Sequence, residues 1–457
     1  MIRERERARP RARFYFFGHG LVHELVYGCF SKWWFVTMAI IVLTSAMLVV
    51  TIKWLTPHPP VLPVGINLNQ PGPGHAERVE SVWFVFLSGP PEVRGADMAR
   101  TVGSQMRAID ASMHQTFRGL FPSPLTRFLV ETFGRIAARH LPDDIPLEIQ
   151  REIVGQTYAQ VDEFGDGGGL YARSLTYLAL HDLAQTLEQS PLIACSAFAV
   201  TGERTQSAQT LVGRNFDFEA GAIFDEQKSV TLFVPEHGHA FLSVAWPGMN
   251  GVVTGINDQH VYVSINAARS DDENPRGEPV SLIVRSVLEQ SATAQEAVDK
   301  LIAAKSRVAD LFLVADPQSA FVVEKTPRHF AVREAKPDIE VSNHFIDPTL
   351  RKEARNQKLE QTTTSKIRYA RLQQLVQKDA TPMEPDRALL ILRDHASLEN
   401  VNYSVGDRRA IDASIATHGV IVDFGGDSLW VSQAPHLASP WLKIRLSGLF
   451  AGRIDKQ

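Results

Sequence analysis

The stretch PLIACSAFAV, residues 191–200, marks the point at which the pattern of the sequence changes. Apolar residues at helical spacing precede it, after one strand-like run at 82–87, and predict helices near 94–114, 124–140, 147–162 and 170–189. Short β-rich runs bounded by turn residues follow it and predict strands at 197–200, 210–213, 229–234, 241–246, 252–255 and 261–265. This order of blocks indicates antiparallel sheets covered by helices.

The pattern repeats further along the chain. A helical stretch near 279–304 precedes strands at 311–315, 320–324 and 329–333. Helices near 366–377 and 385–393 then precede a last pair of strands at 419–423 and 428–432. The sequence therefore predicts an α+β fold built in layers.

Charge and cysteine content exclude several classes of protein. The 457 residues carry a net charge of −4, but residues 1–32 hold seven Lys/Arg and three Glu, so the rest sums to −8. An acidic body argues against nucleic-acid binding. The two cysteines, Cys29 and Cys195, are too few for a disulfide scaffold or a Cys-rich zinc site. We expect no metal and no cofactor.

Residues 33–52, WWFVTMAIIVLTSAMLVVTI, contain no charged residue. Twenty helical residues span roughly the 30 Å of a bilayer's hydrocarbon, and tryptophans stand at both ends of the run. A cleaved signal peptide is the alternative, but the run is long and no small-residue cleavage site follows it. We expect one transmembrane helix at 33–52, a cytoplasmic basic tail at 1–32, and an extracytoplasmic remainder in the periplasm or outside the cell.

The remainder of the chain divides into three parts. Residues 53–80 include a proline-rich stretch at 57–74 that reads as a stiff linker. Residues 81–194 form a mainly helical region, and residues 195–457 form a mainly β region that begins at the only cysteine beyond the membrane segment.

Cys195 is followed nineteen residues later by Arg214 and Asp217, within GRNFDF at 213–218. A charged pair at the end of an apolar strand is costly to bury unless each charge has a partner. An unpaired cysteine taken alone is more often a small buried apolar residue than a nucleophile. The combination makes Cys195 a candidate nucleophile.

Five segments in order resemble the acyl-coenzyme A:6-aminopenicillanic acid acyltransferase family and the related choloylglycine hydrolases. They are LSGPPEVRG (87–95), ACS with GRNFD (194–217), INDQHVYVSIN (256–266, with His260 where a Gly is usual), EVSNH (340–344) and SKIRYARL (365–372). The likeness runs from about 86 to 435. Each motif is weak alone, and the order of five over that span is much more specific.

The resemblance implies an N-terminal nucleophile hydrolase, a four-layer αββα sandwich whose precursor cleaves itself before the nucleophile. In this chain that bond would be Ala194–Cys195. The chemistry is coherent because a thiol needs a base, and a free α-amino group with a pKa near 8 can serve as one. Before cleavage that nitrogen is an amide and cannot accept the proton, so processing would activate the enzyme.

The resemblance also implies roles for further residues. Asp217 would orient the amino group and assist cleavage, and Arg214 would hold Asp217 or the substrate carbonyl region. Asn266 and Asn343 would donate N–H groups to the oxyanion of the tetrahedral intermediate. Arg368 would steady the nucleophile through a charge-assisted hydrogen bond.

Together these features predict a membrane-anchored, self-processing cysteine amidase that hydrolyses linear, non-peptide C–N bonds of small amide or acyl substrates. Two alternatives stay open. One is an acyltransferase that uses the same Cys195 thioester, and the other is an inactive, membrane-tethered binding protein.

Overall fold

The computed structural model describes residues 34, 36–47, 50–51, 54, 56–165, 169–186, 193–378 and 381–457. The chain forms two units, Met1–Thr56 and Pro57–Gln457. In the first unit, residues 34, 36–47, 50–51 and 54 are helical and their large apolar side chains are exposed. Within these described ranges, no helix has both the length and the apolar character required to cross a membrane. Several residues of the predicted span 33–52, and Cys29 in the basic tail, lie outside the described ranges.

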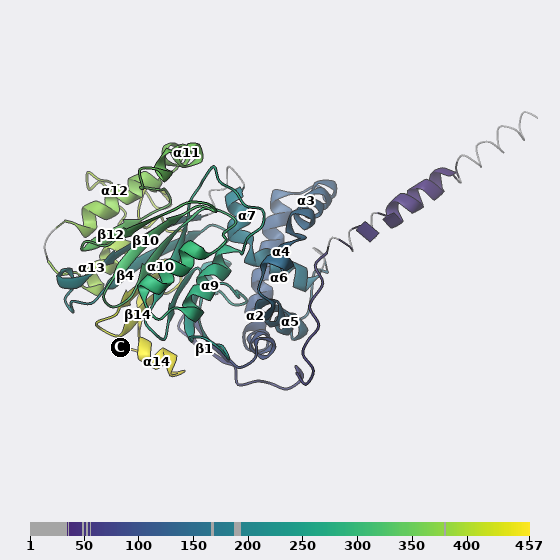
Figure 1. The fold of residues 1–457 in the computed structure, drawn as a ribbon, viewed down its shortest axis with the longest axis horizontal. Helices are drawn as coiled ribbons and strands as arrows, with labels where there is room; N and C mark the ends of the chain where they lie inside the picture. Colours follow the sequence, from purple (N-terminus) through teal and green to yellow (C-terminus); the bar gives the residue numbers. More distant parts are fainter. Residues whose placement is uncertain are drawn as a thin grey trace, which may run out of the picture. The chain divides into compact units, whose positions relative to one another are not determined.

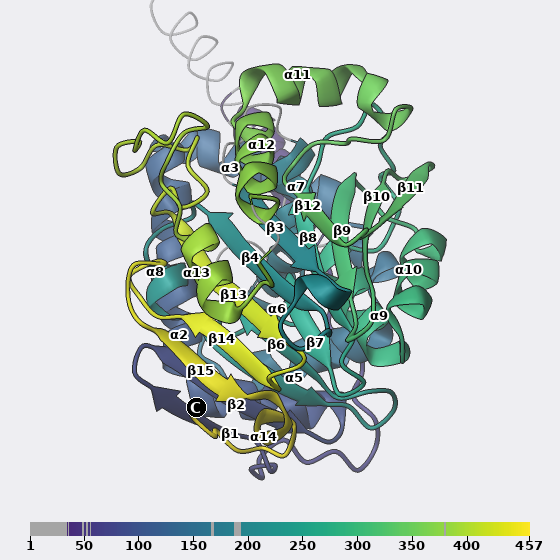
Figure 2. The same ribbon diagram turned by 90° about the vertical axis from the view of Figure 1, so that its left-hand side faces the viewer.

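The second unit contains two sheets (Figures 1 and 2). The nine-stranded sheet has the order β1 (His75–Val79), β2 (Val82–Ser88), β5 (Ser229–Val234), β6 (Phe241–Ala245), β7 (Thr254–Asn257), β8 (Tyr262–Ala267), β9 (Asp310–Ala315), β10 (Ala320–Lys325) and β11 (Phe330–Glu334). Its neighbours are antiparallel except for the parallel pair β2 and β5. The six-stranded sheet is antiparallel, with the order β12 (Asp338–Val341), β3 (Ile193–Val200), β4 (Leu211–Phe218), β13 (Ala416–Asp423), β14 (Ser428–Ser432) and β15 (Trp441–Arg445).

The helices of the second unit lie around the two sheets. They are α2 (Pro91–Leu120), α3 (Pro124–Ala138), α4 (Leu141–Asp144), α5 (Leu147–Tyr158), α6 (Leu170–Leu178), α7 (Leu180–Thr186), α8 (Ile223–Glu226), α9 (Val280–Gln290), α10 (Ala294–Ala303), α11 (Ala354–Thr362), α12 (Ser365–Val376), α13 (Pro385–Leu392) and α14 (Leu446–Phe450). In Figure 1, α12 and α13 lie on one side of the strands and α2, α9 and α10 on the other.

The apolar side chains of β9 show how the layers form. Leu311 and Leu313 belong to the core between the two sheets, whereas Phe312 and Val314 face the helices. Side chains alternate along a strand, so a strand buried on both faces needs a continuous apolar run. A third core joins the six-stranded sheet to α12 and α13. The layers therefore follow in the order helices, sheet, sheet, helices, and the α+β class predicted from the sequence is confirmed.

Helices α2 and α5 pack with their backbones nearly in contact. A Cβ on Gly95 would lie 1.8 Å from the carbonyl oxygen of Glu152, and one on Gly155 would lie 2.0 Å from that of Glu92. Glu152 then reaches across to α9, where its carboxylate accepts hydrogen bonds from Arg285 at 2.7 and 2.9 Å. The helical region before residue 194 is thus joined to the later part of the chain by a buried ion pair.

Two predicted helices are each divided. The stretch 170–189 breaks at Ala179 into α6 and α7, and 279–304 breaks between α9 and α10. In the second case the side chain of Thr293 accepts a hydrogen bond from the backbone N–H of Glu296, which caps a new helix. The strand runs predicted after residue 195 overlap strands of the structure, but β4 extends to Phe218 and β7 begins two residues later than predicted. The elements that were not predicted are β1, β15, α4, α8, α11 and α14.

Candidate active site

Cys195 is the third residue of β3 and its side chain is fully buried. In the antiparallel pairing of β3 with β4, Cys195 lies opposite Phe216, and Ala197 lies opposite Arg214. Directly opposed residues share a face of the sheet. Cys195 and Arg214 therefore lie on the same face, toward the nine-stranded sheet.

Arg214 is fully buried, and the groups to which its guanidinium donates are neutral. Its guanidinium donates to the carbonyl oxygens of Val253 and Ile265 and, at 2.7 Å, to Oγ1 of Thr254. Its Nη2 lies 3.8 Å from Sγ of Cys195. Burial raises the pKa of the Cys195 thiol, and the positive charge of Arg214 opposes that rise. A thiolate would be the nearest negative charge for this arginine.

Asn343 and Arg368 hold the backbone of Cys195. The backbone N–H of Cys195 donates to Oδ1 of Asn343 at 2.9 Å, and Nη2 of Arg368 donates to the same oxygen at 2.8 Å. Nη1 of Arg368 donates to the carbonyl oxygen of Cys195 at 2.5 Å and to Oγ of Ser196 at 2.8 Å. The side chain of Arg368, from α12, is buried, so it is part of the site and not of a solvated helix face.

Asp217 lies directly opposite Ala194, on the face of β4 that Arg214 does not share. The expectation that Arg214 holds Asp217 is wrong, because residues three apart on a strand point to opposite faces. Burial raises the pKa of Asp217 to about 7, and the nearest opposing charge is Arg368. The carboxyl group therefore lies beside the residue that precedes the nucleophile.

Asn266 is buried on β8, and its Nδ2 donates to the carbonyl oxygen of Ser342 at 2.8 Å. Asn343 uses its own Nδ2 in the same way, toward the carbonyl oxygen of Ala267 at 2.9 Å. Each amide has a second N–H group. Donation to an oxyanion stays a prediction for both residues.

Two residues of this neighbourhood carried no signal in the sequence. Oγ1 of Thr254, which contacts Arg214, lies 2.8 Å from Nε2 of His418 on β13. The His418 ring stacks on Phe216 with centroids 5.0 Å apart. Burial, together with the charge of Arg214, lowers the pKa of His418 well below its usual value, so the ring is neutral. The pairing of β13 with β4 places His418 opposite Phe216, and the packing of the nine-stranded sheet on the six-stranded sheet brings Thr254 to Arg214.

An apolar pocket, with an empty volume of about 680 Å³ that includes space open to solvent, shares part of its lining with the apolar core to which Cys195 belongs. An aromatic wall connects the two: Phe216 neighbours Phe218, with ring centroids 6.3 Å apart, and Phe218 stacks on Trp246 at 5.5 Å. Trp246 lines the pocket with Phe224 and with Met106, Ile109, Met113 and Met249. In the part of the chain that the structure describes, no group of three or more His, Cys, Asp or Glu side chains could hold a metal ion.

The chain is similar to known proteins in its second half. The family model for acyl-coenzyme A:6-aminopenicillanic acid acyl-transferase matches residues 204–410. The matched range contains Arg214, Asp217, Asn266, Asn343 and Arg368 and begins nine residues after Cys195. The match confirms the resemblance drawn from the five motifs.

An uncharacterized protein of Archaeoglobus fulgidus is 26% identical over 184 residues, which cover 35% of this chain. The alignment spans 31% of that relative's length.

Three solved structures align with the chain. An N-acylethanolamine-hydrolyzing acid amidase ortholog of Caenorhabditis elegans has 16% identity and a TM-score of 0.37, covering 50% of this chain and 93% of that one. Penicillin V acylase of Agrobacterium tumefaciens has 15% identity and a TM-score of 0.39, covering 56% and 87%. A conjugated bile acid hydrolase variant of Clostridium perfringens has 12% identity and a TM-score of 0.37, covering 57% and 96%.

Proposed function

We propose that this chain, which resembles the acyltransferase family over residues 204–410, is a self-processing cysteine amidase that acts on linear amides. The observation that carries the proposal is the 2.9 Å hydrogen bond from the backbone nitrogen of Cys195 to Oδ1 of Asn343. A side chain and not a neighbouring strand holds this nitrogen. It is the atom that cleavage at Ala194–Cys195 would convert into the catalytic amine.

The proposed cleavage uses groups already beside the bond. The thiol of Cys195 gives up its proton to water as Sγ attacks the carbonyl carbon of Ala194. The C–N bond then breaks, and the nitrogen takes a proton as it leaves. Water then hydrolyses the resulting thioester, which leaves a carboxylate on Ala194 and an α-amino group on Cys195. Asp217, protonated below pH 7, is the proposed proton source for the departing nitrogen.

Turnover would repeat the chemistry on a substrate. The α-amino group accepts the thiol proton, and the thiolate beside Arg214 attacks the amide carbonyl. The amine product leaves with a proton, and water releases the acyl group from the thioester. Asn266 and Asn343 are the proposed donors to the oxyanion.

The pocket lined by Trp246 supports an apolar acyl group as the substrate's main recognition element. Its lining is rich in methionine and aromatic side chains, which adapt to flexible chains. Asp110, the carboxylate among the lining residues, is bound by Arg173 and Tyr177, at 3.1 and 2.7 Å. A neutral chain fits such a lining better than a charged one.

The division of the chain follows from this function. We propose that processing leaves a membrane-tethered chain 1–194, which includes the helical region 81–194, and a chain 195–457 that begins at the nucleophile. The uncharged run at 33–52, whose large apolar side chains are exposed where the structure describes them, is the proposed membrane anchor, with the basic tail at 1–32 in the cytoplasm. Retention of the full chain in membranes after alkaline extraction, and its loss on deletion of 33–52, would test the anchor.

Mass spectrometry of the purified protein tests processing. We expect a fragment that begins at Cys195 in the parent, none in Cys195→Ala, and slower formation in Cys195→Ser. An intact chain that still hydrolyses amides would refute the mechanism. Failure of a thiol-reactive amide probe to label Cys195 in processed protein would favour the inactive binding protein.

An acyltransferase is the second candidate, favoured by the description of the matched family. Both activities pass through the Cys195 thioester and differ in whether water or an amine accepts the acyl group. Transfer of the acyl group to an added primary amine, in competition with hydrolysis, would distinguish them.

A further inference from the structure

Helix α3, Pro124–Ala138, presents a row of large apolar side chains to solvent. Their exposed fractions range from 40 to 73%, for Leu125, Phe128, Leu129, Phe133 and Ile136. The spacing of three and four residues places all five on one face of the helix. Scattered exposed apolar residues are ordinary on protein surfaces, but a continuous row on one helix marks an interaction surface.

The other side of α3 is less exposed. Ala138, at the end of the helix, is buried in an apolar core with Leu141 and Ile145, and Arg127 and Val130 are half-buried. In Figure 1, α3 lies at the margin of the helical layer, beyond α4 and α6 and away from both sheets. The apolar row is therefore the outward face.

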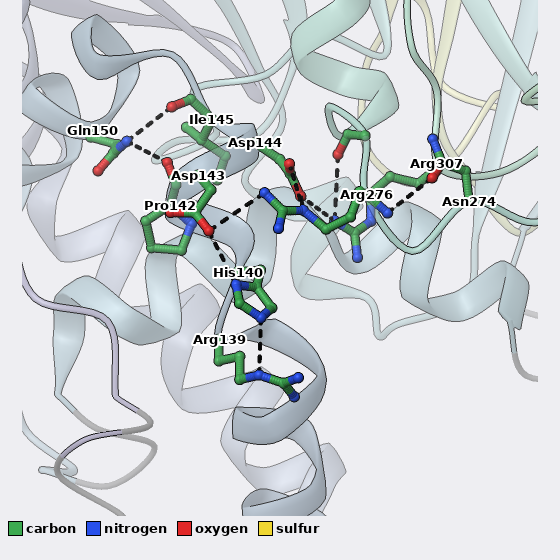
Figure 3. A network of polar contacts seen from close by, with 11 residues as sticks. Arg139, His140, Pro142, Asp143, Asp144, Ile145, Gln150, Asn274, Arg276 and Arg307 are labelled. Atoms are coloured by element: carbon green, nitrogen blue, oxygen red, sulfur yellow. Dashed lines mark hydrogen bonds and ion pairs between the residues drawn. The ribbon is translucent and has the colours of Figure 1, made fainter.

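A polar network fixes the end of α3 to the body (Figure 3). His140, just after the helix, lies 3.1 Å from the carboxylate of Asp143. The adjacent Asp144 accepts hydrogen bonds from Arg276 at 3.1 Å and from Arg307 at 3.3 Å. Both arginines belong to the region after Cys195, so the orientation of α3 is coupled to the proposed catalytic region.

Basic residues accompany the apolar row. The segment 118–140 contains four arginines (118, 127, 135 and 139) and one glutamate, a net charge of +3 within a chain of net charge −4. An apolar helix face with arginines around it has the composition of helices that lie in the headgroup region of a membrane. Anionic headgroups would complement the arginines.

We propose that the exposed apolar face of α3 docks on a lipid bilayer that carries anionic headgroups. The length of the linker supports a bilayer over a partner protein as the occupant. Residues 57–74 number eighteen and can extend at most about 60 Å. If the proposed anchor at 33–52 crosses a bilayer, the linker would keep the body close to that bilayer. Docking would add a second, oriented contact to that tether.

Photo-cross-linking tests the proposal in the full chain. A benzoylphenylalanine replaces either Phe133 on α3 or Leu390 on α13, whose side chains are 73 and 71% exposed. In Figure 1, helices α3 and α13 lie on opposite sides of the strands. Each protein is reconstituted in vesicles of phosphatidylcholine with phosphatidylserine and irradiated. Mass spectrometry then measures lipid adducts. We expect several-fold more lipid adduct at position 133 than at 390.

The control separates docking from tethering, because both positions share one anchor. Equal lipid labelling at 133 and 390 would overturn the proposal, as would adducts at 133 to a second copy of the chain in place of lipid. A double variant, Phe128→Ser with Leu129→Ser, should lower lipid labelling at 133 severalfold. Unchanged labelling in that variant would also overturn the proposal. The experiment can be run in Cys195→Ala and so does not depend on the proposed catalysis.

Discussion

The backbone nitrogen of Cys195 and the side-chain oxygen of Asn343 are joined by a 2.9 Å hydrogen bond across 148 residues of sequence. The same oxygen accepts from Arg368, whose other nitrogen binds the Cys195 carbonyl oxygen. The backbone N–H and C=O groups of Cys195 are thus both held by side chains, those of Asn343, just after β12, and of Arg368, on α12. The nucleophile is positioned before any cleavage takes place.

Replacement of Asn343 tests this arrangement. Asn343→Ala removes the acceptor for the Cys195 nitrogen, and we expect self-cleavage to slow by about 10²-fold, comparable to the loss of one well-placed active-site hydrogen bond. Asn343→Asp keeps an oxygen at that place and should be slowed less. Time courses of fragment formation measure both rates. Cleavage of Asn343→Ala at the parent rate would contradict the assigned role.

Thr254 is expected to act on Cys195 through Arg214. Thr254→Val removes the 2.7 Å hydrogen bond to the guanidinium, so Arg214 should stabilise the thiolate less well. The pH profile of Cys195 alkylation by iodoacetamide should move to higher pH in processed Thr254→Val and stay unchanged in Thr254→Ser. Peptide mass spectrometry separates Cys195 from Cys29. Superimposable profiles for the parent and Thr254→Val would rule out this positioning role.

Asp217 should impose a pH limit on processing. Burial raises the pKa of Asp217 to about 7, so its neutral form predominates below that pH and can supply a proton to the departing nitrogen. We expect the rate of self-cleavage to decline above pH 7. In Asp217→Asn, cleavage should be slow and its rate should not decline above pH 7. If the rate of Asp217→Asn still declines above pH 7, a group other than Asp217 causes the pH dependence.

Glu152 should contribute stability that acid removes. Burial alone would raise its pKa, but the charges of Arg285 and Arg94 outweigh burial and lower the pKa from 4.5 to about 2. A carboxylate with a lowered pKa stabilises the fold above its unfolded pKa and loses that effect as pH falls toward 2. The shift corresponds to a contribution on the order of 3 kcal/mol.

We therefore expect Glu152→Gln to lower the free energy of unfolding by about 3–5 kcal/mol at pH 7, because two buried arginines lose their partner. The deficit should shrink as the pH approaches 2. Denaturant titrations in a Cys195→Ala background, which keeps the chain intact, measure the change. Glu148→Gln, an exposed position on the same helix α5, is the control. Equal stability of the two variants would contradict the importance of the ion pair.

The pocket should determine acyl-chain length. Ile109→Trp fills part of the pocket, and we expect kcat/KM for long-chain amides to fall by about 10²-fold while that for acetyl amides stays constant. If the larger side chain keeps about four methylene groups of the acyl chain out of the pocket, the substrate loses about 0.8 kcal/mol of binding free energy for each, which accounts for this magnitude. A chain-length series measures it. A parallel loss for all chain lengths would show that the pocket does not receive the acyl group.

The sequence by itself determined the α+β class and the candidate nucleophile, because periodicity and motif spacing are local properties. The predicted strand 210–213 is the start of β4, and the motif that follows it contains Arg214 and Asp217. The predicted helix 366–377 contains Arg368. His260, which stands where the motif that it resembles has Gly, adopts a φ of 62°, the left-handed conformation that favours glycine.

Only the tertiary structure decided which of these residues meet. Strand alternation separates Arg214 from Asp217. The pairing of β13 with β4 places His418 on the face of the sheet that Arg214 shares, and the packing of β7 from the other sheet brings Thr254 to Arg214. Nothing in the local spacing of residues that lie 164 positions apart encodes such a contact. It exists because two sheets bury their facing side chains against each other, and burial obliges each polar group there to find a partner.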